Sequence, residues 1–183
     1  MAIIKVASSI FSTVRTITKA LKVAKTGDTI HLSEGTYNEH IEIEGTVTIE
    51  GAGTQHTCIE GSVIVKKGAS IVFENITFHP STTIQIDGNV FFNHCDISTS
   101  YVPTLLCVSG TLDIKHSIVS GAKEIGIELR PNAQLTVDQC AIYSNGKANI
   151  LADYATVDLY NSTLHSANHA IWLRNSSSLN STK

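Results

Sequence analysis

The sequence predicts an all-β fold, a single-stranded right-handed parallel β-helix in which three short strands per turn build a three-sheet solenoid. Two observations predict it. Apolar-x-apolar triplets recur about every 22 residues from Ile41 onward, and polar residues follow one set of triplets at a constant offset. Strands this short cannot bury one face alone, so each turn has to stack on its neighbours.

The register of the repeat comes from triplets that precede a polar residue. Their inward-facing pairs are Val47/Ile49, Ile71/Phe73, Val90/Phe92, Leu112/Ile114, Leu135/Val137 and Val157/Leu159. Successive pairs are 24, 19, 22, 23 and 22 residues apart. A sandwich of β-hairpins would instead show turn dipeptides about every 8–12 residues and no constant register. The constant spacing therefore favours parallel stacking.

Two further apolar columns complete each turn. The upstream column consists of Ile41/Ile43, Val63/Val65, Ile84/Ile86, Leu106/Val108, Ile127/Leu129 and Ile171/Leu173. In the intervening turn the alignment is poorer, because it places Asn149 and Leu151 in the inward positions. The downstream column consists of Phe78, Ile97, Val119, Ile142 and Leu164.

Polar residues mark the bend between the second and third strands of each turn. They are Gly51, Asn75, His94, His116, Gln139 and Asn161. Asn tolerates left-handed backbone angles, which a tight bend requires. We therefore interpret His94 and His116 as members of this stacked column rather than as metal ligands or catalysts.

An amphipathic segment from about Ser12 to Lys25 precedes the coils. Its apolar residues follow helical spacing, and they are Val14, Ile17, Leu21 and Ala24. We expect Ser12 or Thr13 to cap this helix and Gly27-Asp28 to end it. The helix would cover the open end of the apolar stack.

The chain is long enough for one domain, with residues 1–27 as the N-terminal cap and residues 28–183 as coils. No matching cap is visible after Leu173. We expect that end to be uncapped or truncated, covered by a partner or used for self-association.

Composition narrows the environment and the partners. The net charge is −3 and the basic residues are scattered, so nucleic acid is not an expected partner. We see no signal peptide or membrane span, which favours a cytoplasmic protein that does not bind membranes. The four cysteines are expected to be reduced, since Cys95 and Cys140 would lie two turns apart, too far for a disulfide.

The stretch ITKALKVAKTGDTIHLSEGTYNEHIEIEGTVTIEGAG resembles the N-terminal cap and first coil of the pectin lyase-like superfamily of right-handed β-helices. Within it, Gly35-Thr36-Tyr37-Asn38-Glu39 looks like the GxYxE signature of pectin methylesterases. The catalytic motifs of those enzymes, such as QDTL, DFIFG and LGRPW, are missing, as are those of polygalacturonases and uronan epimerases. The resemblance therefore implies the fold and assigns no catalytic residue.

In superfamily members that act on polysaccharides, the substrate usually lies on the outer face of the first sheet. By strand alternation, two outward columns form this face here. The binding residues expected from them are Gln85, Asp87, Cys107, Glu128, Arg130, Trp172 and Arg174. Trp172 is the only tryptophan and suits stacking on a sugar ring or a partner surface. Arg130 and Arg174, expected to flank Ala152, suit a carboxylate.

Three functions remain open. The first is a non-catalytic recognition or scaffold module for a protein or a polysaccharide, within a larger protein. The second is a carbohydrate-active enzyme, resembling a pectate lyase or pectin esterase, that acts on an acidic polysaccharide. The third is a structural β-helix that assembles through its open end. No pair of carboxylates and no cluster of metal ligands stands out, so we expect no cofactor and no metal, and the balance is against catalysis.

Overall fold

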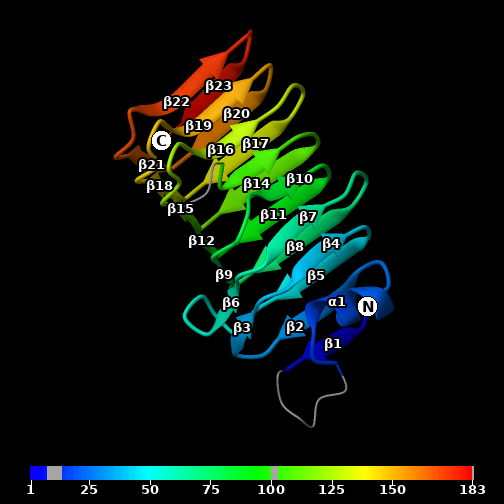
Figure 1. The fold of residues 1–183 in the computed structure, drawn as a ribbon. Helices are drawn as coiled ribbons and strands as arrows, with labels where there is room; N and C mark the ends of the chain where they lie inside the picture. The colour runs from blue at the N-terminus through cyan, green and yellow to red at the C-terminus, as the bar shows by residue number, and fades with distance from the viewer. Residues whose placement is uncertain (8–13, 100–102, 183) are drawn as a thin grey trace.

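The molecule is a right-handed parallel β-solenoid of about eight turns of roughly 22 residues, which confirms the predicted fold class (Figure 1). The computed structural model describes residues 1–7, 14–99 and 103–182. The N-terminus and helix α1 (Ile17–Val23) lie at one end, and the strands stack from there toward the C-terminus. Within the described ranges, no helix is long and apolar enough to span a membrane.

Three parallel sheets run along the solenoid. The first sheet contains β4 (His40–Ile43), β7 (Ser62–Val65), β10 (Ile84–Ile86), β13 (Leu105–Cys107), β16 (Ile125–Leu129), β19 (Ala148–Asp153) and β22 (His169–Arg174). The second contains β1 (Ile3–Val6), β2 (Asp28–Leu32), β5 (Thr46–Glu50), β8 (Ser70–Glu74), β11 (Asn89–Asn93), β14 (Thr111–Lys115), β17 (Gln134–Asp138), β20 (Thr156–Tyr160) and β23 (Ser178–Thr182). The third contains β3 (Gly35–Tyr37), β6 (Thr57–Ile59), β9 (Thr77–Phe78), β12 (Asp96–Ser98), β15 (Ile118–Ser120), β18 (Ala141–Tyr143) and β21 (Thr163–His165).

The core is a stack of like residues from successive turns. Phe73 and Phe92 are register partners on β8 and β11, and their rings stack with centroids 5.2 Å apart. Phe78 meets both rings edge-on, at 5.1 and 5.5 Å, and all three side chains are fully buried. Aromatic pairs in these geometries add to the stabilisation from burial alone.

The bend between the second and third sheets adopts the predicted left-handed conformation. The φ angles are 59° at Asn75, 51° at His94, 49° at His116, 54° at Gln139 and 48° at Asn161. The rings of His94 and His116 stack with centroids 4.7 Å apart. This backbone geometry turns five successive coils at the same point, whereas Gly51, the first residue of the predicted column, is not left-handed.

The N-terminal cap differs from the expected one. Helix α1 is shorter than the predicted segment, with Thr16 as its N-cap, and the predicted caps Ser12 and Thr13 lie outside the described residues. The Glu39 carboxylate accepts from the backbone N–H groups of Ile17 and Thr18, at 2.8 and 3.0 Å. This contact from the first coil helps to determine where the helix begins.

An unforeseen strand, β1, extends the second sheet beyond β2. Asp28 links this strand to the end of the helix segment, because its carboxylate accepts from the backbone of Ala2 at 2.6 Å and of Lys25 at 2.9 Å. At the other end, the last turn leaves inward-column residues such as Leu173 and Leu179 exposed.

Candidate functional site

The outer face of the first sheet carries most of the predicted binding residues, in three pairs that lie two turns apart. Gln85 and Asp87 lie on and just after β10, where the Gln85 side-chain amide donates to Asp87 at 2.9 Å. Glu128 lies two turns further along on β16, and one of its oxygens is 2.7 Å from the guanidinium of Arg130. The sheet therefore does not gather the predicted residues into one site.

Cys107 was predicted to face outward, and this placement is wrong. Register pairs it with the inward residues Ile86 and Leu129, and it is fully buried, while Leu106 occupies the outward position. Burial raises the pKa of the Cys107 thiol to about 12, so the group is a neutral apolar filler. The sequence Leu105-Leu106-Cys107-Val108 is apolar throughout, so alternation alone could not decide which residues point inward.

The expected parity of β19 is also wrong. Ile150 and Ala152 continue the inward columns, whereas Leu151 pairs with Glu128 and Trp172 in the outward column. Asn149 is nevertheless buried, because its amide accepts from Asn145 at 2.8 Å and donates to a backbone carbonyl. Asn149 has the same outward orientation as Leu151, and this satisfied amide pair allows the polar side chain to be buried there.

Because of that shift, Asp153 rather than Ala152 lies between Arg130 and Arg174 along the stack. Trp172 continues the outward column of Glu128 and Leu151, and its side chain is 38% exposed. The Arg174 guanidinium lies 5.9 Å from the centre of the indole, and the His169 ring lies 5.4 Å from it. The C-terminal part of the first sheet is thus an aromatic and charged surface.

A second candidate, not recognised in the sequence, lies on the outer face of the second sheet. Here a hollow of about 470 Å³, the second-sheet groove, crosses β11, β14, β17 and β20. Its outward side chains are Phe91, Asp113, Lys115, Thr136, Asp138 and Tyr160. Alternation between the inward pairs gives these outward positions, but the hollow depends on the differing lengths of their side chains.

The polar groups of the second-sheet groove are held in place. The Lys115 ammonium lies 3.2 Å from Asp138, and the side-chain amide of Asn161 donates to the same carboxyl at 3.3 Å. These two contacts, first the Asn161 hydrogen bond and then Lys115, lower the pKa of Asp138. Tyr160 is 37% exposed at one end of the groove.

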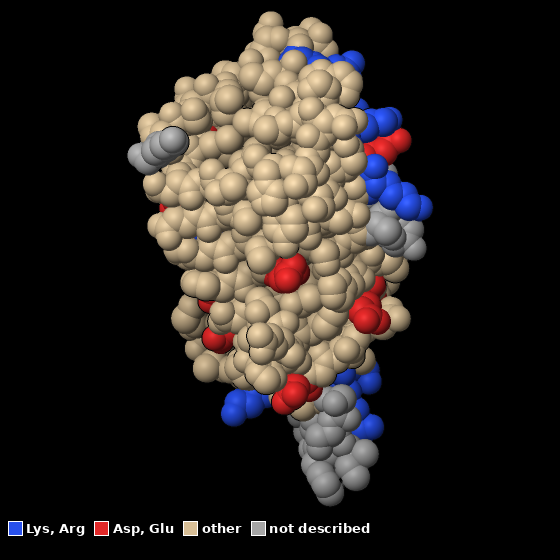
Figure 2. All heavy atoms as spheres, turned by 90° about the vertical axis from the view of Figure 1, so that its left-hand side faces the viewer, with Lys and Arg blue, Asp and Glu red and all other residues tan. Residues whose placement is uncertain are grey.

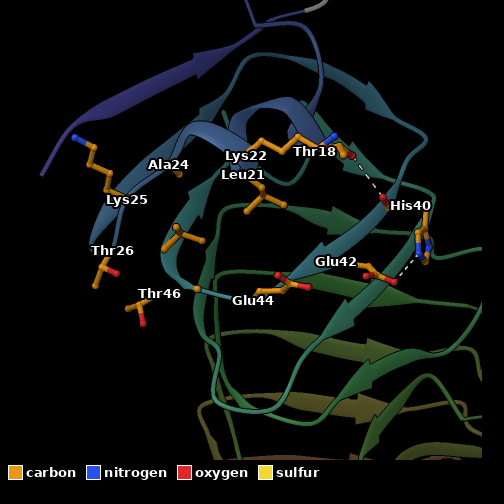
Figure 3. Close-up of a pocket in the computed structure, with 12 residues that line it drawn as sticks. Thr18, Leu21, Lys22, Ala24, Lys25, Thr26, His40, Glu42, Glu44 and Thr46 are labelled. Carbon is orange, nitrogen blue, oxygen red and sulfur yellow. Dashed lines mark hydrogen bonds and ion pairs between the residues drawn. The ribbon is translucent and has the colours of Figure 1, made fainter.

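A third hollow, of about 480 Å³, lies between α1 and the turn after β4 (Figure 3). We call it the helix hollow, and its lining includes Leu21, Lys22, Lys25, His40, Glu42, Glu44 and Val47. His40 and Glu42 are joined by a hydrogen bond, drawn as a dashed line, from the Nε2 edge of the ring to Oε1 at 3.1 Å.

The face that carries the third sheet is poor in charge (Figure 2). Its outward positions hold mainly small, hydroxyl and apolar side chains, while Glu34, Glu60 and Asp96 are acids on or directly beside the described strands. No group of three or more metal-ligating side chains is found in the described part of the chain. The clusters of charged side chains therefore lie on the outer faces of the first and second sheets.

Comparisons with known proteins agree with this architecture. A family model described as "Right handed beta helix region" matches residues 12–182, so the chain belongs to that family. The crystal structure of the pectin methylesterase from Aspergillus niger has a TM-score of 0.53 at 13% identity, covering 96% of this chain and 85% of that one. Pectin methylesterase from carrot has a TM-score of 0.45 at 12% identity, covering 98% and 88%. The comparison with curated proteins returned no significant match.

At 13% identity, the Aspergillus niger structure bears on the fold alone. It agrees with the superfamily resemblance of the N-terminal stretch, and the roles of individual residues still have to be argued from the site itself.

Proposed function

We propose that this β-helix is a carbohydrate-recognition protein that binds a neutral saccharide chain in the second-sheet groove. The observation that carries the proposal is the combination of two aromatic side chains with fixed polar groups in one hollow. Binding sites for small ligands commonly combine apolar walls with a few placed hydrogen-bonding groups.

The dimensions of the groove suit a short oligosaccharide. Phe91 and Tyr160 lie three turns apart on the second sheet, which corresponds to about 14 Å at the usual spacing between strands. Aromatic rings offer flat apolar surfaces for sugar rings. Between them, the Thr136 hydroxyl and the Asp113 carboxylate are available for sugar hydroxyl groups.

Charge argues for a neutral chain rather than the acidic polysaccharide that the enzyme alternative would act on. The outward lining has two carboxylates, Asp113 and Asp138, against one ammonium, Lys115, which is already paired. Asp158 follows Asp113 and Thr136 in the same column of the sheet. A uronate chain would bring more negative charge to this surface and would be repelled.

Isothermal titration calorimetry with neutral tri- and tetrasaccharides tests the proposal, with trigalacturonate as the anionic comparator. We expect Tyr160→Ala to weaken binding about tenfold, which corresponds to about 1.4 kcal/mol. Tyr154→Ala is the matched control, because Tyr154 is 57% exposed outside the groove. Absence of binding to every neutral chain, or tighter binding of trigalacturonate, would contradict the proposal.

Tryptophan fluorescence separates this groove from the first-sheet surface. Trp172 is the only tryptophan, so its emission reports directly on ligand at the C-terminal part of the first sheet. Saccharide in the second-sheet groove should leave that emission unchanged. A shift that saturates with the calorimetric signal would instead assign binding to Trp172 and Arg174.

A further inference from the structure

We infer that Ser62, His40 and Glu42 form a hydrolytic site for short-chain carboxylic acid esters on the first sheet, apart from the second-sheet groove. Ser62 is the nucleophile, His40 is the general base, and Glu42 is a positioning residue that orients the imidazole. The inference goes beyond saccharide recognition and does not depend on it.

Strand pairing brings the three side chains together. His40 on β4 and Ser62 on β7 are direct register partners in adjacent turns. Glu42 is two residues after His40, so strand alternation places both on the outer face. The Ser62 hydroxyl is hydrogen-bonded to Nδ1 of His40, while Nε2 of the same ring bonds Oε1 of Glu42 at 3.1 Å.

The bonding pattern determines which ring nitrogen carries the proton. An ionised carboxylate only accepts hydrogen bonds, so Nε2 of neutral His40 must hold the hydrogen that it donates to Glu42. Nδ1 is then an acceptor, and the Ser62 hydroxyl must donate to it. A hydroxyl that donates to a neutral imidazole is the starting arrangement for a serine nucleophile, which recurs on unrelated folds.

Glu42 is held at both oxygens. Oε1 contacts His40, and Oε2 lies 3.2 Å from the ammonium of Lys66 in the next turn. These contacts, the His40 hydrogen bond first, lower the pKa of Glu42, so the carboxylate stays ionised when His40 is neutral. Two anchors also restrict the rotation of the carboxylate, which keeps Nε2 oriented.

The helix hollow gives an ester a place to bind beside this chain of hydrogen bonds. His40 and Glu42 lie on its wall, and Leu21, Ala24 and Val47 supply apolar surface (Figure 3). Its volume of about 480 Å³ falls within the range of small-molecule sites. Ser62 is not among the residues that line the hollow, so the reacting carbonyl of a bound ester has to lie at the edge beside His40, where the Ser62 hydroxyl is hydrogen-bonded to the ring.

The reaction follows acyl transfer to water. The Ser62 oxygen bonds to the acyl carbon as its proton passes to Nδ1 of His40. The bond to the ester oxygen breaks, and the departing alcohol takes that proton from His40. Water then attacks the acylated Ser62 while His40 accepts its proton and returns it to the serine oxygen, which releases the carboxylic acid.

A second serine–histidine pair in the same chain serves as an internal control for this site. The hydroxyl of Ser98 lies 2.9 Å from Nδ1 of His79, which reproduces the serine–histidine contact on the third sheet. In the described ranges, no carboxylate forms an ion pair with His79. The second pair thus has the nucleophile and base but lacks the group that orients the base.

The test is covalent labelling with a fluorophosphonate probe, located by peptide mass spectrometry, together with release of 4-nitrophenol from 4-nitrophenyl acetate. We expect the probe on Ser62 and not on Ser98. Ser62→Ala should abolish the label, and His40→Gln should slow labelling at least 100-fold, the scale of general base catalysis. Ser98→Ala should leave the rate unchanged, and circular dichroism would verify that each variant is folded.

The role of Glu42 has a separate readout. Glu42→Gln should slow labelling about tenfold and should reduce the fraction of His40 protonated at Nε2, as measured by nitrogen-15 chemical shifts of the ring. Glu42→Asp should restore part of the rate. Equal labelling of Ser62 and Ser98, or no labelling of Ser62 when a known serine hydrolase is labelled in parallel, would overturn the inference.

Discussion

At the scale of single residues, the sequence repeat identifies the side chains of the apolar interior more reliably than it identifies those of the surface. The inward pairs of the second sheet follow the sequence repeat closely, because a misplaced apolar side chain would lose its stacked partner above and below. The prediction of which residues face inward was wrong at Leu105-Leu106-Cys107-Val108, because four consecutive apolar residues show no alternation. It failed again at β19, where Asn149 faces outward yet is buried against Asn145, while Ile150 and Ala152 enter the core.

Truncation of a stacked ring should be costly. Phe92→Ala is expected to lower the free energy of unfolding by about 3–5 kcal/mol, because Phe92 is fully buried and packs against both Phe73 and Phe78. Urea denaturation followed by circular dichroism measures it. A loss below about 1 kcal/mol would show that the inward assignment is wrong.

Buried thiols should make the protein sensitive to alkali. Burial raises the pKa of Cys95 and of Cys107 from 9.0 to about 12. Below pH 9 these thiols are neutral in both states, so their contribution to stability is fully present. Between pH 9 and 12 the unfolded chain loses these protons while the folded one retains them, so the free energy of unfolding should fall across this range.

Denaturation at several alkaline pH values measures that fall. Cys95→Ser would be confounded by its new hydroxyl, so the matched variant is Cys107→Val, which removes one titrating group from an apolar site. A free energy of unfolding that changes equally in Cys107→Val and the parent chain would contradict the assignment of the effect to Cys107.

At the scale of elements, the bends are determined by local sequence, whereas the helix also depends on a contact from a distant residue. The bend column could be predicted, since Asn and His at a fixed offset indicate a left-handed turn. The start of α1 was placed too early, because Ser12, Thr13 and Thr16 are all residues suited to an N-cap. Thr16 caps the helix, and the contact that supports this start comes from Glu39, which is distant in sequence.

The bend geometry predicts opposite outcomes for two substitutions. His116 has φ of 49°, so the β-branched variant His116→Val should lose about 1–2 kcal/mol of stability. His116→Asn should be close to neutral, since Asn tolerates this conformation. Thermal unfolding of the pair measures the difference, and equal losses would argue against backbone strain as the cause.

The cap of α1 is testable in the same way. Glu39→Ala removes acceptors from two backbone N–H groups and from the Thr18 hydroxyl, so a loss of about 1–2 kcal/mol is expected. Hydrogen exchange should show faster exchange for the first turn of α1. Glu44→Ala is the control, since Glu44 is exposed and forms no ion pair in the described part of the chain. Equal effects of the two variants would contradict the capping role.

At the scale of the whole molecule, stacking places residues from distant parts of the chain at a constant spacing. The sequence repeat predicts this scaffold and which residues of the second and third sheets face outward. It does not predict where an outward face becomes hollow, because that depends on neighbouring side-chain lengths over several turns. The second-sheet groove was therefore missed, although every residue that lines it has the predicted parity.

The contact between Glu39 and α1 also changes what the segment Gly35-Thr36-Tyr37-Asn38-Glu39 can be used for. Tyr37 donates its hydroxyl to backbone carbonyls of Val6 and Ser33, and Glu39 holds the helix, so both side chains fasten the terminal cover to the first rung. In this protein the Gly-x-Tyr-x-Glu pattern attaches the N-terminal cap to the first coil. In this chain the pattern therefore has a structural role at the first coil and carries no information about which bond, if any, the protein cleaves.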